Sequence, residues 1–253
     1  MTETFPGVGG VALALHRLGP KEGSGRPVIL LHGLMSSAQT NWVTYGTAAP
    51  LAARGFECLM PDLRAHGESA KPRDAAGYPH DVLAGDVAAL VAHLGLTDYD
   101  LVGYSLGART AIRSVIAGST PRRLVLGGMG WEGLTQGSRR RDFFLGAIDA
   151  YDTAKPGDPA YFAVQFMKTT DVDRVAVRML IETFVDTPAS AIEAVTVPTL
   201  VVCGADDQDN GSAPTLAARM PQAELVTIPG NHMSAVTKPD LGSAIADFLL
   251  DRT

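Results

Sequence analysis

Residues 101–109, LVGYSLGAR, constrain the fold of this chain more than any other stretch, because an apolar run meets a serine that has a glycine two residues away on each side. Side chains at Gly103 and Gly107 would collide with nearby backbone if the chain turned sharply from a strand into a helix, so only hydrogen atoms fit there. The flanking sequence predicts a buried strand over 99–102 and a helix over 108–117 that stops at Gly118. Such a turn presents Ser105 at the carboxyl end of a strand, where a nucleophile is expected.

Apolar runs alternate with helical patterns over most of the chain, which is typical of an α/β fold. Unbroken apolar runs indicate strands buried on both faces, as in parallel sheets. Strands are expected at 27–31, 58–60, 124–126, 199–203 and 225–228, with helices ending near 54–55 and covering 81–94 and 241–250. An antiparallel pair at 5–8 and 11–17, joined through Gly9 and Gly10, is expected at a sheet edge. We therefore predict a mostly parallel, doubly wound sheet with helices on both faces.

The pattern changes between residues 131 and 190, where no strong strand is found and helices are expected near 139–151, 159–168 and 173–186. We predict a core of residues 1–130 and 191–253 with a small helical cap at 131–190. The cap holds half of the aromatic residues of the chain, and we expect them to divide between a pocket wall and the cap's own core. The predicted pocket residues are Met35, Tyr104, Trp131, Phe143, Phe144, Phe166 and Met233.

Two later strand ends carry the groups that a serine nucleophile needs. A serine hydroxyl requires a base to take its proton, and a buried carboxylate orients that base. Asp207 follows the predicted strand at 199–203, and His232 follows the strand at 225–228. The order Ser105, Asp207, His232 is that of hydrolases in which the serine stands on such a turn. Asp206 and Glu132 remain alternatives for the acid.

These motifs resemble the α/β-hydrolase superfamily, and more closely its capped serine-esterase members. The resemblance covers nearly the whole chain and rests on residues 31–34 (LHGL), 62–69 (DLRAHGES), 103–107 (GYSLG), 204–207 (GADD) and 230–233 (GNHM). It implies an oxyanion hole formed by the backbone N–H groups of Leu34 and Leu106. It also implies hydrolysis of carboxylic esters with small to medium apolar groups through an acyl-enzyme, with no cofactor and no metal. Thioesterase, lactonase, perhydrolase or carbon–carbon bond hydrolase activity, and a small-molecule receptor that retains the triad, are the alternatives.

The resemblance implies a small-molecule ester and water as partners, and charge and composition argue against other classes of partner. The formal net charge of −6 and the lack of a basic run longer than residues 139–141 argue against nucleic-acid binding. No apolar run approaches membrane-spanning length, and the first residues lack the features of a secretory signal, so a cytoplasmic location is expected. Cys58 and Cys203 fall in predicted strands, and His32 and His66 in loop motifs, where structural roles are expected. The histidines form no metal-ligand pattern.

Overall fold

A single eight-stranded sheet forms the centre of the computed structural model, which describes residues 3–20 and 23–250. The strands are β1 (Glu3–Pro6), β2 (Ala12–Leu18), β3 (Arg26–Leu31), β4 (Phe56–Pro61), β5 (Asp100–Tyr104), β6 (Leu124–Gly127), β7 (Thr199–Gly204) and β8 (Ala223–Ile228). Their order is β1-β2-β4-β3-β5-β6-β7-β8. β1 and β2 are antiparallel and form one edge, whereas β3 to β8 are parallel. The predicted sheet and its antiparallel edge are confirmed.

Alternate residues of each central strand pack on opposite faces of the sheet. In β3, Ile29 and Leu31 belong to one apolar cluster, and Val28 and Leu30 to the other. All four side chains are fully buried. This explains the unbroken apolar runs, because both faces of a parallel sheet are covered by helices.

The helices cover both faces of the sheet. They are α1 (Ala48–Ala53), α2 (Val82–His93), α3 (Leu106–Ile116), α4 (Trp131–Thr135), α5 (Gly137–Asp149), α6 (Tyr161–Thr170), α7 (Arg174–Glu182), α8 (Ala189–Glu193), α9 (Ala213–Arg219), α10 (His232–Ala235) and α11 (Pro239–Leu250). Short turns of other helix types cover Val8–Gly10, Gln39–Thr44 and Ala75–Gly77. Residues of α2, α3, α8 and α9 share one apolar cluster, and residues of α1, α10 and α11 share the other. The chain therefore has the three-layer arrangement expected of a doubly wound sheet.

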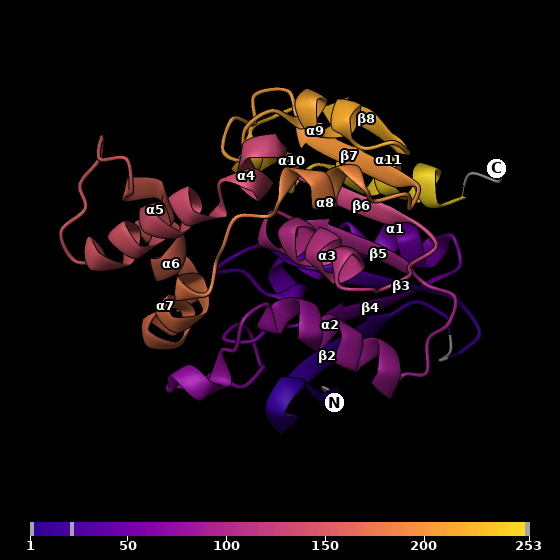
Figure 1. The fold of residues 1–253 in the computed structure, drawn as a ribbon, viewed down its shortest axis with the longest axis horizontal. Coiled ribbons are helices and arrows are strands. Elements are labelled where there is room, and N and C mark those ends of the chain that lie inside the picture. Colours follow the sequence, from indigo (N-terminus) through magenta and orange to yellow (C-terminus); the bar gives the residue numbers. More distant parts are fainter. Residues whose placement is uncertain (1–2, 21–22, 251–253) are drawn as a thin grey trace.

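Five helices, α4 to α8, lie in sequence between β6 and β7. Figure 1 shows α5, α6 and α7 standing outside the sheet, beyond its left edge in this view. The three long helices expected in this region are present with boundaries shifted by a few residues. The short helices α4 and α9 were not predicted, since each is only one to two turns long and too short to show a helical repeat.

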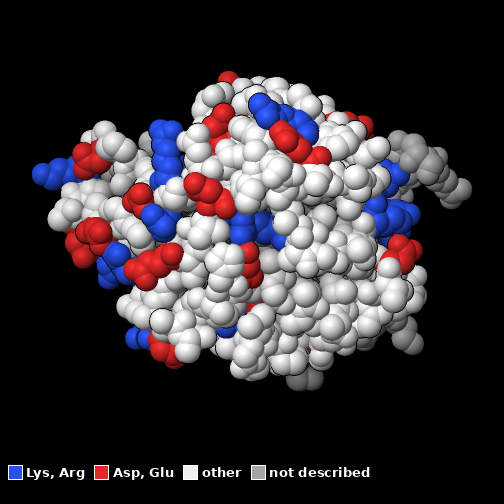
Figure 2. Space-filling view, in the orientation of Figure 1, with Lys and Arg blue, Asp and Glu red and all other residues white. Residues whose placement is uncertain are grey.

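Charged residues of both signs are interspersed on the face shown in Figure 2, many of them over the protruding helices. No single-sign patch dominates this face. Among the described helices, none is long and apolar enough to cross a membrane.

Candidate active site

Ser105 lies between β5 and α3 with a backbone φ of 54° and ψ of −112°. This left-handed φ is unusual for a residue with a side chain and reflects local strain. The strained residue is held on both sides, because its N–H donates to Gly127 O at 2.8 Å and its carbonyl accepts from Arg109 N at 3.0 Å. The sequence-predicted strand, turn and helix are all confirmed.

The two glycines around Ser105 allow the turn to be this tight. A Cβ atom at Gly103 would lie 2.2 Å from the Gly107 carbonyl carbon, and one at Gly107 would lie 1.9 Å from Leu31 O. Both neighbours are backbone atoms, which cannot move away cheaply. The prediction that only hydrogen fits at these positions is confirmed.

His232 and Asp207 meet Ser105 at the carboxyl edge of the sheet. The Ser105 Oγ lies 3.0 Å from His232 Nε2, and His232 Nδ1 lies 2.9 Å from Asp207 Oδ2. An ionised carboxylate only accepts hydrogen bonds, so Nδ1 donates to Asp207 and Nε2 is left to accept from the Ser105 hydroxyl. His232 begins α10, and its carbonyl accepts from the Tyr104 hydroxyl at 2.6 Å. We call these three residues the Ser105–His232–Asp207 array.

The two alternative acids are placed differently from Asp207. Asp206 is exposed, and its backbone N–H donates to Gly230 O at 3.0 Å. Glu132 accepts from Ser212 N at 2.8 Å through Oε2. Only Asp207, of these three carboxylates, is hydrogen-bonded to His232 within the described part of the chain.

Leu34 and Leu106 flank Ser105 in the same cavity. Within residues 3–20 and 23–250, neither of their backbone N–H groups donates a hydrogen bond to the protein. Leu106 is the first residue of α3, so its N–H is one of the donors that a helix start leaves free. The loop that carries Leu34 is fixed by its neighbour, because Gly33 N donates to Asn41 Oδ1 at 3.0 Å. Two free donors beside a serine can stabilise a negatively charged oxygen.

Buried histidines hold the loops behind Leu34. His32 Nε2 accepts from Leu63 N, and His66 Nε2 accepts from Met35 N, each at 2.9 Å. Burial lowers the pKa of His66 from its ordinary value of 6.5 to about 3, so the ring stays neutral and can accept. The structural roles expected for His32 and His66 are confirmed.

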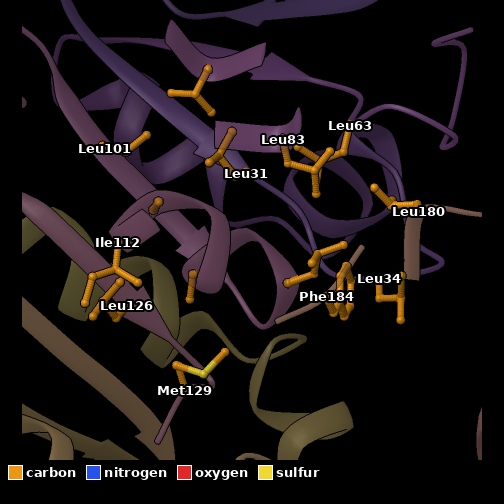
Figure 3. Packing of buried hydrophobic residues seen from close by; sticks show 14 of the residues in the cluster. Leu31, Leu34, Leu63, Leu83, Leu101, Ile112, Leu126, Met129, Leu180 and Phe184 are labelled. Carbon is orange, nitrogen blue, oxygen red and sulfur yellow. The ribbon is translucent and has the colours of Figure 1, made fainter. Parts of the chain in front are cut away.

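A cavity of about 30 Å³ lies directly beside Ser105. Its apolar lining comes both from the loops and helix start at the carboxyl edge of the sheet and from the α4–α8 segment. Figure 3 shows Leu34 and Phe184 side by side, with Met129 nearer the strands. The lining residues are Leu34, Ser105, Leu106, Arg109, Met129, Gly133, Gly137, Arg140, Phe144, Phe184 and Asn210.

Of the predicted pocket residues, the structure brings only Phe144 into this lining. Tyr104 is buried beneath His232, with the two ring centres 5.3 Å apart, and Met35 is buried in the core. Phe166 packs against the apolar core. Trp131 stacks under the Arg219 guanidinium, Phe143 lines a neighbouring cavity, and Met233 is 47% exposed. These six residues face other surroundings because helix packing, and not aromatic content, decides which side chains reach the cavity.

Several lining residues were missed by sequence reasoning. Arg109 lies one helical turn after Ser105. It stands just beyond the 103–107 motif, and the motif gave no reason to place its side chain in the cavity. Arg140 was noted only as part of a basic run. Phe184 belonged to the cap aromatics expected to divide between a pocket wall and the cap core, but it was not among the named pocket residues. Asn210 and Met129 carried no sequence signal.

Comparison with known proteins identifies the family. The model of the alpha/beta hydrolase family matches residues 28–241, which is most of the chain. The chain belongs to the alpha/beta hydrolase family. Solved structures with the same fold include proteins titled hydrolase or esterase.

The relatives of this alpha/beta hydrolase differ in their named activities. It is 38% identical over 41% of its length to an N-formylmaleamate deformylase from Pseudomonas putida, of which it covers only 37%. It is 30% identical over 90% of its length to a non-heme haloperoxidase from Rhodococcus erythropolis, covering 93% of that protein. A solved esterase from Rhodococcus sp. ECU1013 is similar with a TM-score of 0.75 and 25% identity, over 98% of both chains.

The described residues contain no group of three or more His, Cys, Asp or Glu side chains that could hold a metal ion. Cys58 and Cys203 are both buried and unlinked.

Proposed function

We propose that this alpha/beta hydrolase cleaves carboxylic esters of small substrates through a covalent acyl-serine intermediate. The observation that supports the proposal most directly is the Ser105–His232–Asp207 array, with its two hydrogen bonds of 3.0 and 2.9 Å. Both contacts lie within the range in which a base can take a proton from a nucleophile.

The array supports a two-step mechanism. His232 takes the Ser105 proton as Oγ attacks the substrate carbonyl, and Asp207 stabilises the resulting imidazolium. The N–H groups of Leu34 and Leu106 stabilise the oxyanion of the tetrahedral intermediate. The imidazolium then gives its proton to the leaving alcohol, and water repeats the sequence to release the acid and restore Ser105.

We further propose that residues 131–190 act as a cap over this site. Phe144, Arg140 and Phe184 line the cavity from that segment, whereas Leu34 lines it from the loop after β3 and Leu106 from the start of α3. A site walled from both sides excludes water from the developing charge.

The test is steady-state hydrolysis of p-nitrophenyl esters by the purified protein, with Ser105→Ala and His232→Ala as controls. We expect each variant to fold and to lose about 10⁴-fold or more in kcat. Turnover by Ser105→Ala close to that of the wild type would overturn the proposal.

A second candidate activity is perhydrolysis, favoured by the near full-length similarity to a haloperoxidase. In that case hydrogen peroxide attacks the acyl-serine in place of water, which releases a peracid and restores the Ser105 hydroxyl. Peracid formation from acetate and peroxide, lost in Ser105→Ala, would support it.

A further inference from the structure

Arg109 is a buried cation with an unused donor in the wall of the Ser105 cavity. It lies on α3 and is 7% exposed. Its Nη2 donates to Val185 O, and its guanidinium carbon lies 5.3 Å from the centre of the Phe184 ring. Its Nη1 is buried without any hydrogen-bond partner within the described residues. A buried charged donor left without a partner is costly, so the structure carries it for a reason other than its own stability.

Asp81 and Asp186, the acidic residues whose charges act on Arg109, already have other hydrogen-bond partners. Asp81 is held by Arg113 through two side-chain hydrogen bonds, and Asp186 accepts from Ser138. No carboxylate of the described residues forms an ion pair with Arg109. Burial lowers the pKa of Arg109 to about 10, which still leaves the guanidinium charged at neutral pH.

Arg140 brings a second cation to the same cavity from α5. Its guanidinium carbon lies 4.8 Å from the centre of the Phe144 ring and 5.3 Å from that of Phe143. Asp207 and Asp209 are the acidic groups near enough to act on it electrostatically, but neither forms an ion pair with it within the described residues. Both guanidinium groups therefore line the cavity without a carboxylate partner of their own.

We infer that the cavity is a carboxylate subsite, so that the preferred substrates are small esters that carry a carboxylate on the acyl part. Resting on the proposed ester hydrolysis, this inference follows from two guanidinium groups beside Ser105 that have no carboxylate partner, in a wall whose other residues carry no charge. Guanidinium groups match the planar geometry of a carboxylate and bind it through paired hydrogen bonds. The subsite determines specificity, and the reacting atoms remain those of the Ser105–His232–Asp207 array.

Two esters of the same shape test the inference. Monomethyl succinate carries a carboxylate where methyl 4-methylpentanoate carries an isopropyl group. Methanol release gives kcat/KM for each ester with wild type, Arg109→Gln, Arg140→Gln and Arg139→Gln. Arg139 is the matched control, because it neighbours Arg140 on α5 but is exposed and does not line the cavity.

We expect the wild type to prefer monomethyl succinate. Arg109→Gln and Arg140→Gln should each lower kcat/KM for that ester by about 10- to 100-fold, the range for a lost charge-assisted hydrogen bond. Turnover of the neutral ester should stay within about threefold, and Arg139→Gln should behave as the wild type. Arg140→Gln keeps the test decisive if Arg109→Gln does not fold.

The two proposals fail in different ways. Serine-dependent turnover with no preference for the anionic ester, or equal losses on both esters in Arg109→Gln and Arg140→Gln, would overturn the carboxylate subsite alone. The absence of any serine-dependent turnover would overturn the ester hydrolysis. In that case, succinate binding to Ser105→Ala by calorimetry still tests the subsite, and equal binding to Ser105→Ala with and without Arg140→Gln would overturn it.

Discussion

The two oxygen atoms of the Asp207 carboxylate have different partners. Oδ2 lies 2.9 Å from His232 Nδ1, and Oδ1 accepts from Asp209 N at 3.1 Å. The second bond fixes the plane of the carboxylate, so that the first can fix the plane of the imidazole. An amide at this position would face Nδ1 with a donor or favour the wrong imidazole tautomer.

Asp207→Asn should therefore reduce kcat by about 10³- to 10⁴-fold while the protein remains folded. Asp206→Asn is the matched control, because the neighbouring carboxylate is exposed and does not contact His232. Ester hydrolysis by both variants gives the comparison. An equal loss in Asp206→Asn would show that the acid is wrongly assigned.

The neutral state of His66 predicts that the protein loses stability in acid. Its pKa falls from 6.5 in the unfolded chain to about 3 in the fold, because the ring is buried. Below pH 6.5 the unfolded chain binds a proton that the folded chain refuses, so the free energy of unfolding falls as pH drops toward 3. The slope is about 1.4 kcal/mol per pH unit for each such group.

Urea unfolding between pH 7 and 4 measures this slope. His66→Gln, whose amide can still accept from Met35 N, should make it shallower, whereas His80→Gln changes an exposed side chain and should not. Identical slopes in the wild type and His66→Gln would contradict the prediction.

At the scale of elements, the crossing of α3 against β3 positions the nucleophile. The helix approaches so closely that Gly107 touches the backbone of Leu31, and its amino end points at the space beside Ser105. The start of a helix carries a partial positive charge, which favours a negatively charged oxygen there. The close approach of α3 to β3 therefore makes the turn at Ser105 tight and also places the positive end of the helix beside it.

Gly107→Ala should destabilise the protein by more than about 3 kcal/mol, because its Cβ would meet backbone that cannot move. Gly146→Ala is the control, for which we expect the opposite change in stability. Gly146 is exposed on helix α5, and a Cβ added there would meet no atom within 4 Å, so alanine should stabilise by about 0.5–1 kcal/mol. The denaturant midpoints of the two variants measure both changes in stability. A Gly107→Ala protein as stable as the wild type would contradict the close packing of α3 against β3.

The sequence was sufficient to predict the location of those site residues that come shortly after a strand. Ser105, Asp207 and His232 each follow a parallel strand, and parallel strands bring their carboxyl ends to one edge whatever happens between them. The lining of the cavity could not be predicted in the same way. Phe143 and Phe144 are neighbours in sequence, yet only the second reaches the cavity, because the rotation of α5 against the core separates them.

The pairing of buried polar side chains could not be predicted from the sequence either. Arg64 is 1% exposed, and its guanidinium binds both oxygens of Asp86 in α2. Nothing in the residues around either side chain indicates the partner, since the pairing depends on how α2 packs beside the loop after β4.

At the scale of the whole molecule, the cavity lies between the loops at the carboxyl edge of the sheet and the helices that follow β6. The cavity beside Ser105 is small, with a volume of about 30 Å³. Phe144 and Phe184 are the two aromatic side chains in its lining, and both belong to residues 131–190. We therefore expect these two rings to limit the length of an apolar acyl group.

We expect the wild type to hydrolyse p-nitrophenyl acetate faster than the hexanoate ester. Phe144→Ala should raise the hexanoate-to-acetate ratio of kcat/KM by about 10-fold, the size of one to two methylene groups of added apolar contact. Phe162→Ala is the control, because Phe162 is 80% exposed on α6. An unchanged ratio in Phe144→Ala would mean that this ring does not limit the acyl group.

The helices α4 to α7 leave and rejoin the sheet between two strands that are direct neighbours. β6 and β7 pair in parallel from Leu124 with Thr199 to Gly127 with Val202, and α8 packs against α3 on the way back to β7. The excursion can therefore lengthen, shorten or be exchanged during evolution without shifting one hydrogen bond of the sheet. The residues that this segment contributes to the cavity, Arg140, Phe144 and Phe184, can therefore be exchanged by recombination of one internal segment while Ser105, Asp207 and His232 keep their positions.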